Sequence, residues 1–301
     1  MCRHALHRAA AAICAPLSLP RTGAAALRIA LLTFESLVSA EAVRRFAAEH
    51  AGRIALVALS DPLRQRRLAE ARRTWRLLRR SGPRLLPYLL GNFVLPRLAP
   101  RPLPGLPARA AAPERTPLPR LCRQLGLPCL KVPDCNAPDF KAALAASGAE
   151  LIVTFHFDQI LAPATLAAVP RGGINVHPGP LPAQRGPVPT LHALLEPAPR
   201  FAVTLHRLAA RIDAGPILAQ QALPLPPDTT ALEAARQLHL AALPLLDATL
   251  PRLAAGAAVE RAVAPLPYCG FPTAAELRRL AAAGRRLADR RDVWRALRLP
   301  A

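Results

Sequence analysis

The sequence is poor in lysine, in acidic residues and in aromatic residues. Of its 40 basic residues only Lys131 and Lys141 are lysines, so 40 − 2 = 38 are arginines, and the formal net charge is +21. Aromatic side chains make up 4% of the 301 residues, whereas 35 residues are proline. An arginine excess favours an anionic partner such as nucleic acid, a membrane surface or an acidic small molecule, but arginines that only face solvent give the same total. The charge alone therefore leaves the partner open.

Three missing motifs exclude other classes. The six cysteines contain no C-x-x-C pair, so no metal site is expected, and scattered thiols in a chain of this size are typical of the reducing cytoplasm. No G-x-G-x-x-G follows the first apolar run, where residues 33–39 read TFESLVS, which argues against a dinucleotide site. The apolar run 85–95 is interrupted by Pro87 and Gly91 and is shorter than the ~20 residues that span a bilayer.

Apolar runs alternate with helical stretches through most of the chain. Strands are expected at 27–34, 54–60, 127–132 and 151–157, and helices at 41–49, 121–125, 136–147, 163–168 and 188–195. This alternation predicts an α/β fold with a Rossmann-like, open, mostly parallel sheet and helices on both faces. Residues 201–207 and 216–223 are expected to form an antiparallel pair. A long helix is expected over 229–250, with Asp228 as its N-cap, and Asn136 is a candidate cap for the helix 136–147.

Three segments lie outside this alternation. Residues 1–27 are expected to be a disordered extension, because their apolar stretch is too short for a secretory signal. Residues 63–120 form an insertion that holds a basic helical segment, an apolar run and a proline-rich loop. The tail 256–301 is expected to contain one helix that starts near 274, where Thr273 and Glu276 have capping-box spacing. The remainder, 28–255, is expected to be one catalytic domain.

The insertion 63–101 has three interpretations. A basic helix beside an apolar segment is typical of an element that lies on a membrane surface. A helical hairpin that covers the cleft or makes a dimer contact explains the same pattern, and contact with RNA is a further alternative. The expected location is the cytoplasm, with peripheral contact at the inner membrane if the first interpretation holds.

The most informative stretch is 172–186, GGINVHPGPLPAQRG. Asn175 and His177 are two residues apart at the end of a short strand, so their side chains share a face. Open α/β sheets bind ligands beyond the carboxyl ends of their strands. Asp213 stands before Ala-Gly-Pro on a turn further along the chain. An amide, an imidazole and a carboxylate can supply an oxyanion donor, a proton carrier and a group that orients it.

The pattern Asn175-x-His177-Pro178, followed by Leu181-Pro182, Arg185-Gly186, Thr204 and Asp213-x-Gly215-Pro216, resembles the folate-dependent formyltransferase family. The resemblance covers roughly 28–250. It implies a formyltransferase fold, 10-formyltetrahydrofolate as formyl donor without a metal, and catalysis by Asn175, His177 and Asp213. The cofactor-binding residues that it implies are Phe157, Asp158, Gln159, Ile160, Leu161 and Ile212. Arg185 and His206 are weaker candidates for substrate contact, while the lone His156 is expected to be a core or strand-end histidine.

The implied reaction is formyl transfer to a primary amine of a small acceptor, such as an amino sugar or a nucleotide-linked amine. Family members that act on tRNA carry a serine where this chain has Gly179, and 256–301 is too short for the β-barrel that they append. These two differences favour a small acceptor, although the positive charge favours nucleic acid. Three alternatives stay open: a formyltetrahydrofolate hydrolase, a methionyl-tRNA formyltransferase, and a non-catalytic, membrane-associated member of the fold. The oligomeric state is not indicated.

Overall fold

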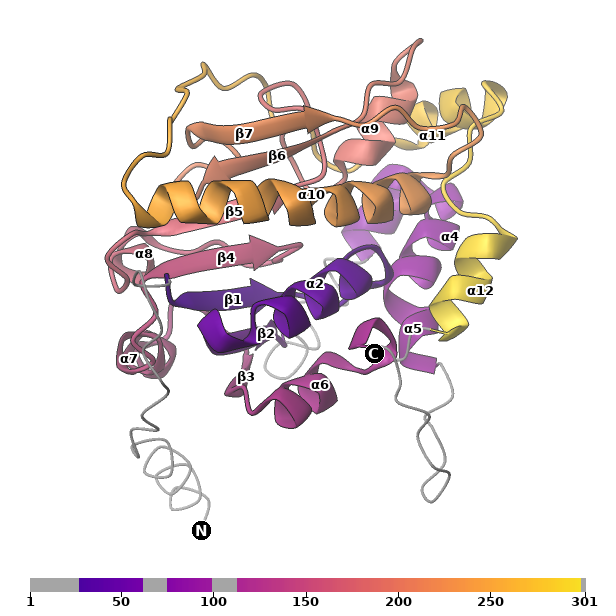
Figure 1. Cartoon of the computed structure of the whole chain (residues 1–301). Helices are drawn as coiled ribbons and strands as arrows, with labels where there is room; N and C mark the ends of the chain where they lie inside the picture. Colours follow the sequence, from indigo (N-terminus) through magenta and orange to yellow (C-terminus); the bar gives the residue numbers. More distant parts are fainter. Residues whose placement is uncertain (1–26, 62–74, 99–112, 299–301) are drawn as a thin grey trace, which may run out of the picture.

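A computed structural model of the chain describes residues 27–61, 75–98 and 113–298. In this part of the chain the strands form one sheet in the order β3-β2-β1-β4-β5-β6-β7 (Figure 1). The strands are β1 (Ile29–Thr33), β2 (Ile54–Ser60), β3 (Cys129–Val132), β4 (Leu151–Phe155), β5 (Gly173–His177), β6 (Ala202–Arg207) and β7 (Ile217–Ala222). Strands β1 to β5 pair in parallel, and β6 runs antiparallel to both β5 and β7. The predicted open, mostly parallel sheet and its antiparallel pair are confirmed.

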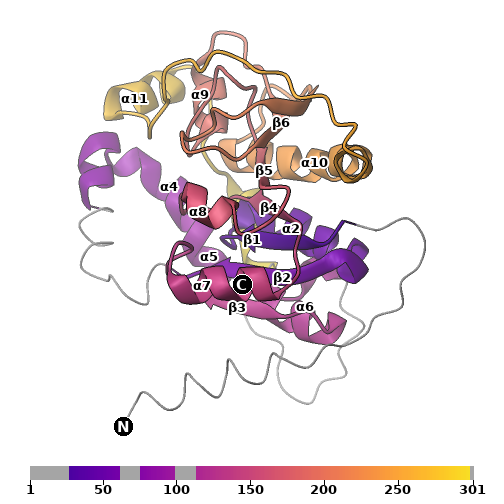
Figure 2. The same ribbon diagram turned by 90° about the vertical axis from the view of Figure 1, so that its left-hand side faces the viewer.

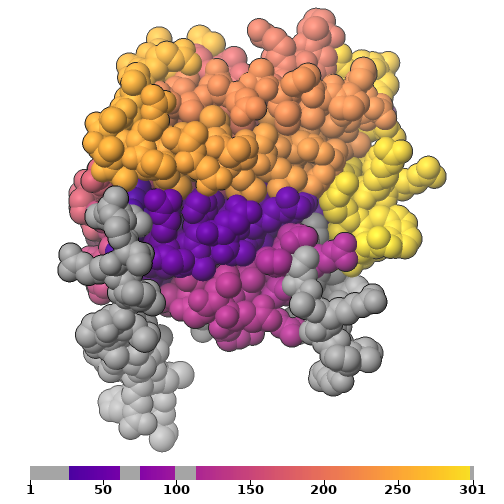
Figure 3. Space-filling view, viewed as in Figure 1, coloured from indigo at the N-terminus to yellow at the C-terminus, as the bar shows by residue number. Residues whose placement is uncertain are grey.

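Helices cover both faces of the sheet (Figure 2). The α-helices are α2 (Leu37–Glu49), α4 (Leu86–Leu89), α5 (Leu95–Leu98), α6 (Leu118–Leu125), α7 (Pro138–Ala146), α8 (Pro163–Leu166), α9 (Pro189–Leu195), α10 (Ala231–Ala254), α11 (Ala274–Ala282) and α12 (Arg290–Arg298). The larger core lies between the sheet and α2, α9 and α10, and the smaller one lies under α7. Strands β1 and β4 are buried on both faces, which explains why their sequences are continuously apolar. In the space-filling view α10, α2 and α6 form adjacent bands (Figure 3).

Two predicted helix caps are wrong. The N-cap of α10 is Thr230, whose side chain accepts a hydrogen bond from the Glu233 amide, and not Asp228. Asn136 does not cap α7; its side chain instead bonds the Ile160 carbonyl and the Ala162 amide. At α10 several polar residues near the helix start could cap it and packing selects Thr230, whereas α7 begins after Ala137 without a side-chain cap.

In the described part of the insertion, residues 75–81 are helical and residues 86–98 form one continuous helix, in which Leu90–Val94 is a π-helical turn. Pro87 lies in the first turn, where a missing N–H costs little. At Gly91 an added Cβ would lie 2.8 Å from Leu232 Cδ1, so glycine lets this helix approach α10 closely. Asn92 accepts a hydrogen bond from the Val38 amide at the start of α2. The insertion is therefore packed against the sheet's own helices, and its residues 62–74 and 99–112 lie outside the described residues.

The tail contains two helices, α11 and α12, where one was expected. The capping box at Thr273 and Glu276 is confirmed, with both reciprocal hydrogen bonds present. The α12 helix was missed because the arginine-rich tail was interpreted as one helix, although Val293, Ala296 and Leu297 have helical spacing. The extension expected at 1–27 lies, apart from Leu27, outside the described residues. Within the described ranges, every helix is too short or too polar to traverse a bilayer.

Candidate functional site

The candidate site lies at the carboxyl end of β5, next to the antiparallel strand β6. Asn175 pairs with His206 and His177 pairs with Thr204 in this register. The side chain of Asn175 uses both of its polar atoms, because Thr154 Oγ1 donates to its Oδ1 at 2.7 Å and its Nδ2 donates to His206 Nε2 at 3.1 Å. Asn175 is thus held by hydrogen bonds to side chains on both neighbouring strands.

Asp213 reaches the same place from the loop between β6 and β7. It has φ of 47°, a left-handed conformation that favours residues such as Asp and Asn. At Gly215 a Cβ would lie 2.0 Å from the Arg207 carbonyl, so this tight turn requires glycine. The Gly186 amide donates to Asp213 Oδ2 at 2.9 Å and fixes the carboxylate. The three residues predicted as catalytic are therefore brought together.

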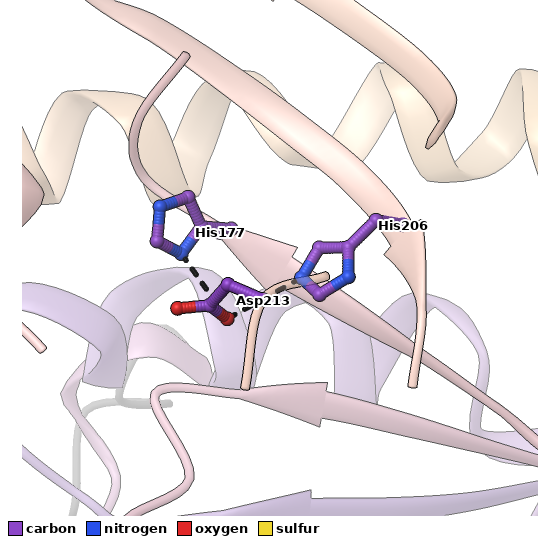
Figure 4. Close-up of side chains that lie close together, drawn as sticks. All are labelled: His177, His206 and Asp213. Carbon is purple, nitrogen blue, oxygen red and sulfur yellow. Dashed lines mark ion pairs between the residues drawn. The ribbon is translucent and has the colours of Figure 1, made fainter. Parts of the chain in front are cut away.

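One carboxylate oxygen of Asp213 faces two histidines (Figure 4). Its Oδ1 lies 3.7 Å from His177 Nδ1 and 3.6 Å from His206 Nε2. The two imidazole rings meet edge to face with their centroids 6.1 Å apart. His177 and His206 are 3% and 1% exposed, so this interaction is only weakly screened by water.

Burial sets the protonation of this group. Burial lowers the pKa of His177, and the Asp213 carboxylate only partly offsets that effect. Burial alone would raise the pKa of Asp213, but His177, His206 and the Gly186 amide outweigh it and lower this pKa to about 2. At neutral pH a neutral His177 imidazole therefore stands beside an ionised carboxylate. Such a pair can accept a proton and stabilise the resulting imidazolium.

Arg185 holds the loops around the site together. Its Nε donates to the Asp213 carbonyl at 3.1 Å, its NH1 donates to the Leu266 carbonyl at 2.7 Å, and its NH2 donates to the Ile212 carbonyl. The side chain is 2% exposed. These contacts do not support the predicted role of Arg185 in substrate binding, and they give it a structural role in the site.

The tail closes over the loop that follows His177. The Cys269 amide donates to the Arg185 carbonyl at 2.7 Å. A Cβ on Gly186, which has φ of 134°, would lie 2.0 Å from the Cys269 carbonyl. His192 on α9 contacts the Gly270 carbonyl at 2.6 Å. Residues 265–272 are therefore part of the wall of the site, which the sequence did not indicate.

The segment expected to bind the cofactor follows β4 at the same edge of the sheet. Asp158 and Ile160 are exposed, and Ile212 is 37% exposed on the Asp213 loop. The Gln159 side chain, in contrast, is held by hydrogen bonds within the protein, to Cys135 N, Ser60 Oγ and the Val132 carbonyl. Leu161 is buried in the smaller core. Binding by this segment stays a prediction, and only its backbone and the exposed side chains are free to contribute.

His206 has a different place from the one predicted. It was expected to contact substrate, but it is buried and contacts Asn175 and Asp213. His156 has φ of 44° and bonds Ser36 Oγ at 2.8 Å, while its ring stacks on Phe93. It is the strand-end histidine that the sequence suggested.

An open α/β sheet with an amide, two imidazoles and a carboxylate at its carboxyl edge defines a protein with a buried acid–base site. Residues 116–248 match the family model described as formyl transferase. This part of the chain is similar to formyl transferases, and the resemblance inferred from the motifs is confirmed.

Relatives and solved structures are consistent with this similarity. A methionyl-tRNA formyltransferase of Roseiflexus castenholzii is 37% identical over 155 residues, 51% of this chain and 50% of the relative. The chain spans about half the length of the curated relatives it matches. A glycinamide ribonucleotide transformylase 1 from Symbiobacterium toebii has a TM-score of 0.51 at 21% identity and covers 82% of this chain and 98% of its own. An N-formyltransferase from Helicobacter canadensis, in complex with folinic acid and dTDP-3-aminofucose, has a TM-score of 0.50 at 12% identity. The match covers 82% of this chain and 71% of that structure. At these identities the structures show the fold alone.

Proposed function

We propose that the chain is an enzyme that transfers the formyl group of 10-formyltetrahydrofolate to a primary amine of a small acceptor. The observation that carries this proposal is the convergence of Asp213 on His177 and His206, beside Asn175. We further propose that residues 28–255 form the catalytic domain and that the protein works in the cytoplasm.

Asn175 would stabilise the tetrahedral oxyanion. Its amide has two N–H groups, of which one donates to His206 Nε2. The second can donate to the oxygen on which negative charge develops, an effect worth ~3 kcal/mol where such donors have been removed elsewhere. The Thr154 hydroxyl, bonded to Asn175 Oδ1, keeps the amide in this orientation.

His177 would take the proton that the amine loses when it attacks. Its Nε2 lies 2.8 Å from the Gln184 carbonyl, which places the proton of the neutral ring on Nε2 and leaves Nδ1 free to accept another. Asp213 would stabilise the imidazolium that forms. The donor supplies the activated formyl group when bound, and no covalent intermediate on the chain is required.

A small acceptor is supported by the packing around Gly179. An added Cβ there would lie 2.6 Å from Pro189 Cβ and 3.0 Å from His177 Nε2, so serine does not fit without a shift of the loop. An amino sugar or a nucleotide-linked amine is the acceptor class that we favour. The tRNA alternative draws support from the matched relatives, which are named methionyl-tRNA formyltransferases. A hydrolase would use the same residues with water as nucleophile.

Donor turnover separates these functions. Purified protein is given 10-formyltetrahydrofolate alone, with a panel of small amines including amino sugars, or with methionyl-tRNA, and release of tetrahydrofolate is measured. We expect turnover that requires a small amine. Turnover without any amine identifies a hydrolase, turnover only with methionyl-tRNA identifies the tRNA enzyme, and no turnover under any condition contradicts an enzymatic function.

We also propose that the insertion contacts an anionic membrane surface. The helix 86–98 carries an outward stripe at four-residue spacing, formed by Leu86, Leu90, Val94 and Leu98, which are 38%, 46%, 40% and 66% exposed. The exposed Arg84 and Arg97 flank this stripe. An apolar stripe beside cationic side chains suits the boundary of an anionic bilayer. Asn92 and Phe93 on the inward side pack against the sheet's helices and His156, which also fits the packed-lid interpretation.

A further inference from the structure

Three donor atoms converge at the candidate site in an arrangement that also suits a metal ion. His177 Nδ1, His206 Nε2 and a carboxylate oxygen of Asp213 all lie within 4.8 Å of one another. Two of the three separations are 3.7 and 3.6 Å. Ligands about 2.0–2.1 Å from a tetrahedral Zn²⁺ lie roughly 3.3 Å apart. The two histidine–carboxylate separations would therefore have to shorten by only a few tenths of an ångström, while the two imidazole nitrogens lie within 4.8 Å of each other.

Both histidines are held in the tautomer that a metal requires. His177 Nε2 lies 2.8 Å from the Gln184 carbonyl, and His206 Nδ1 lies 2.9 Å from the Arg207 carbonyl. A carbonyl oxygen only accepts, so in each neutral ring the proton sits on the nitrogen that faces the carbonyl. The other nitrogen of each ring then presents a lone pair to Asp213. Metal-ligating histidines usually donate their second N–H to a carbonyl or carboxylate in this way.

No hydrogen bond joins either imidazole to Asp213, although His206 Nε2 accepts one from Asn175 Nδ2. The separations from the two imidazoles to Asp213 Oδ1 are beyond hydrogen-bonding distance. Asp213 Oδ2 accepts from the Gly186 amide, which leaves Oδ1 to face the histidines. The nearly buried His177 Nδ1 and Asp213 Oδ1 therefore face each other as two acceptors, an arrangement that a cation would stabilise.

Two features oppose a cation and limit its affinity. Asn175 Nδ2 donates to the same lone pair of His206 that a metal would use, so the amide must turn away when a metal binds. The Arg185 guanidinium, bonded to the Asp213 carbonyl, adds positive charge nearby. We therefore expect weaker binding than at four-ligand structural zinc sites, with one coordination position left to solvent.

We propose that His177, His206 and Asp213 form a binding site for one divalent transition-metal ion of the Zn²⁺ class. Imidazole nitrogens with a single carboxylate favour Zn²⁺ and Co²⁺ over Mg²⁺, which prefers oxygen ligands. The bound ion occupies the lone pair of His177 and displaces Asn175, so it inhibits formyl transfer reversibly. Only this inhibition rests on the function proposed above; the site itself does not.

The test measures metal binding directly. The full chain without an affinity tag is treated with chelator, freed of it and titrated with Co²⁺, whose tetrahedral complexes absorb visible light. Zn²⁺ and Mg²⁺ are then added as competitors. We expect one Co²⁺ per chain, displaced by Zn²⁺ and not by Mg²⁺. His206→Asn and Asp213→Asn are each expected to raise the Kd for Co²⁺ at least tenfold.

The chain offers a matched control on its surface. Glu49, His50 and Asp247 are the second group of potential ligands in the described residues, and Glu49 and Asp247 are exposed. His50→Asn removes one ligand there and should leave Co²⁺ binding unchanged. Circular dichroism and thermal unfolding verify that each variant is folded. If one of the two site variants does not fold, the other still tests the site.

The proposal is overturned if the wild type binds no Co²⁺, if binding persists at full affinity in both site variants, or if it is lost in His50→Asn. An inactive wild type that still binds one Co²⁺ through these residues would contradict the proposed function and leave the metal site standing.

Discussion

Asp213 Oδ1 lies 3.7 Å from His177 Nδ1, and both side chains are nearly buried. Burial lowers the pKa of His177, and the carboxylate is the larger of two influences that raise it, the other being the hydrogen bond to the Gln184 carbonyl. The pair therefore accounts for how a buried imidazole can still take up a proton during a reaction.

Asp213→Asn should weaken proton uptake by His177. Without the carboxylate the pKa of His177 falls further and the imidazolium loses its counter-charge, so we expect kcat to fall on the order of 10²–10⁴-fold. In the wild type the acidic limb of the rate profile should lie below pH ~6.5, because burial lowers the pKa of His177. In the variant this limb should move to still lower pH. Steady-state rates from pH 4.5 to 8 measure both effects, and a kcat within twofold of wild type would contradict the assigned role.

His239 should make folding stability depend on pH. Burial lowers the pKa of this histidine on α10 to about 3, whereas in the unfolded chain it is near ~6.5. The unfolded state thus binds the proton first, and stability present above pH ~6.5 is lost as pH falls toward the folded pKa, at up to ~1.4 kcal/mol per pH unit. His239→Leu should reduce the slope of unfolding free energy between pH 6 and 4.5 by about this amount.

Urea denaturation at several pH values measures that slope. Asp213, with its pKa lowered to about 2, loses its contribution only below pH ~4, outside this window. The buried Leu243 on the same helix is the control, because Leu243→Ala should lower stability at every pH without changing the slope. An identical slope in wild type and His239→Leu would refute the prediction.

Arg185→Lys should destabilise the loops around the site. One ammonium group cannot reach the carbonyls of Asp213, Leu266 and Ile212 at once, and each buried carbonyl left unpaired costs about 1–3 kcal/mol. We expect the unfolding free energy to fall by roughly 2–4 kcal/mol. Arg200→Lys is the matched control, since the Arg200 side chain is 79% exposed in a surface ion pair with Glu196 and such pairs are worth ~0–1 kcal/mol. Equal effects of the two substitutions would argue against the anchor.

Vesicle co-sedimentation tests the exposed helix. The Leu90→Glu, Val94→Glu double variant places charge in the apolar stripe and should lose at least tenfold of the affinity for vesicles that contain phosphatidylglycerol. The control is Val259→Glu, because Val259 is 73% exposed outside this helix. Neutral phosphatidylcholine vesicles should bind the wild type weakly. The membrane proposal is wrong if the wild type does not bind anionic vesicles, or if the double variant and Val259→Glu bind them equally well.

Much of the fold and half of the site follow from local sequence patterns. The strands are apolar runs that any buried parallel sheet requires, and Asn175 with His177 follow from strand alternation. Asp213 was found through the turn residues that succeed it. These signals are local, so they need no knowledge of how distant segments pair.

The remaining parts depend on contacts between distant segments. His206 joins the site only because β6 pairs antiparallel with β5 in a register that sets it opposite Asn175, and no local pattern specifies a register. The same holds for Arg185, whose partners lie on two other loops, and for the tail over Gly186. The prediction of no metal site was based on the absence of cysteine pairs. The ligands proposed above are instead two histidines and an aspartate that only the fold brings together.

Donor turnover by an Asn175→Ala, His177→Ala variant tests the central claim most directly. The variant is compared with wild type in release of tetrahydrofolate from 10-formyltetrahydrofolate in the presence of an accepted amine, with thermal unfolding measured on both. The account predicts that the variant stays folded while its turnover falls at least 10³-fold, as the loss of an oxyanion donor and a proton carrier together implies. Turnover at the wild-type rate in a folded variant would contradict it.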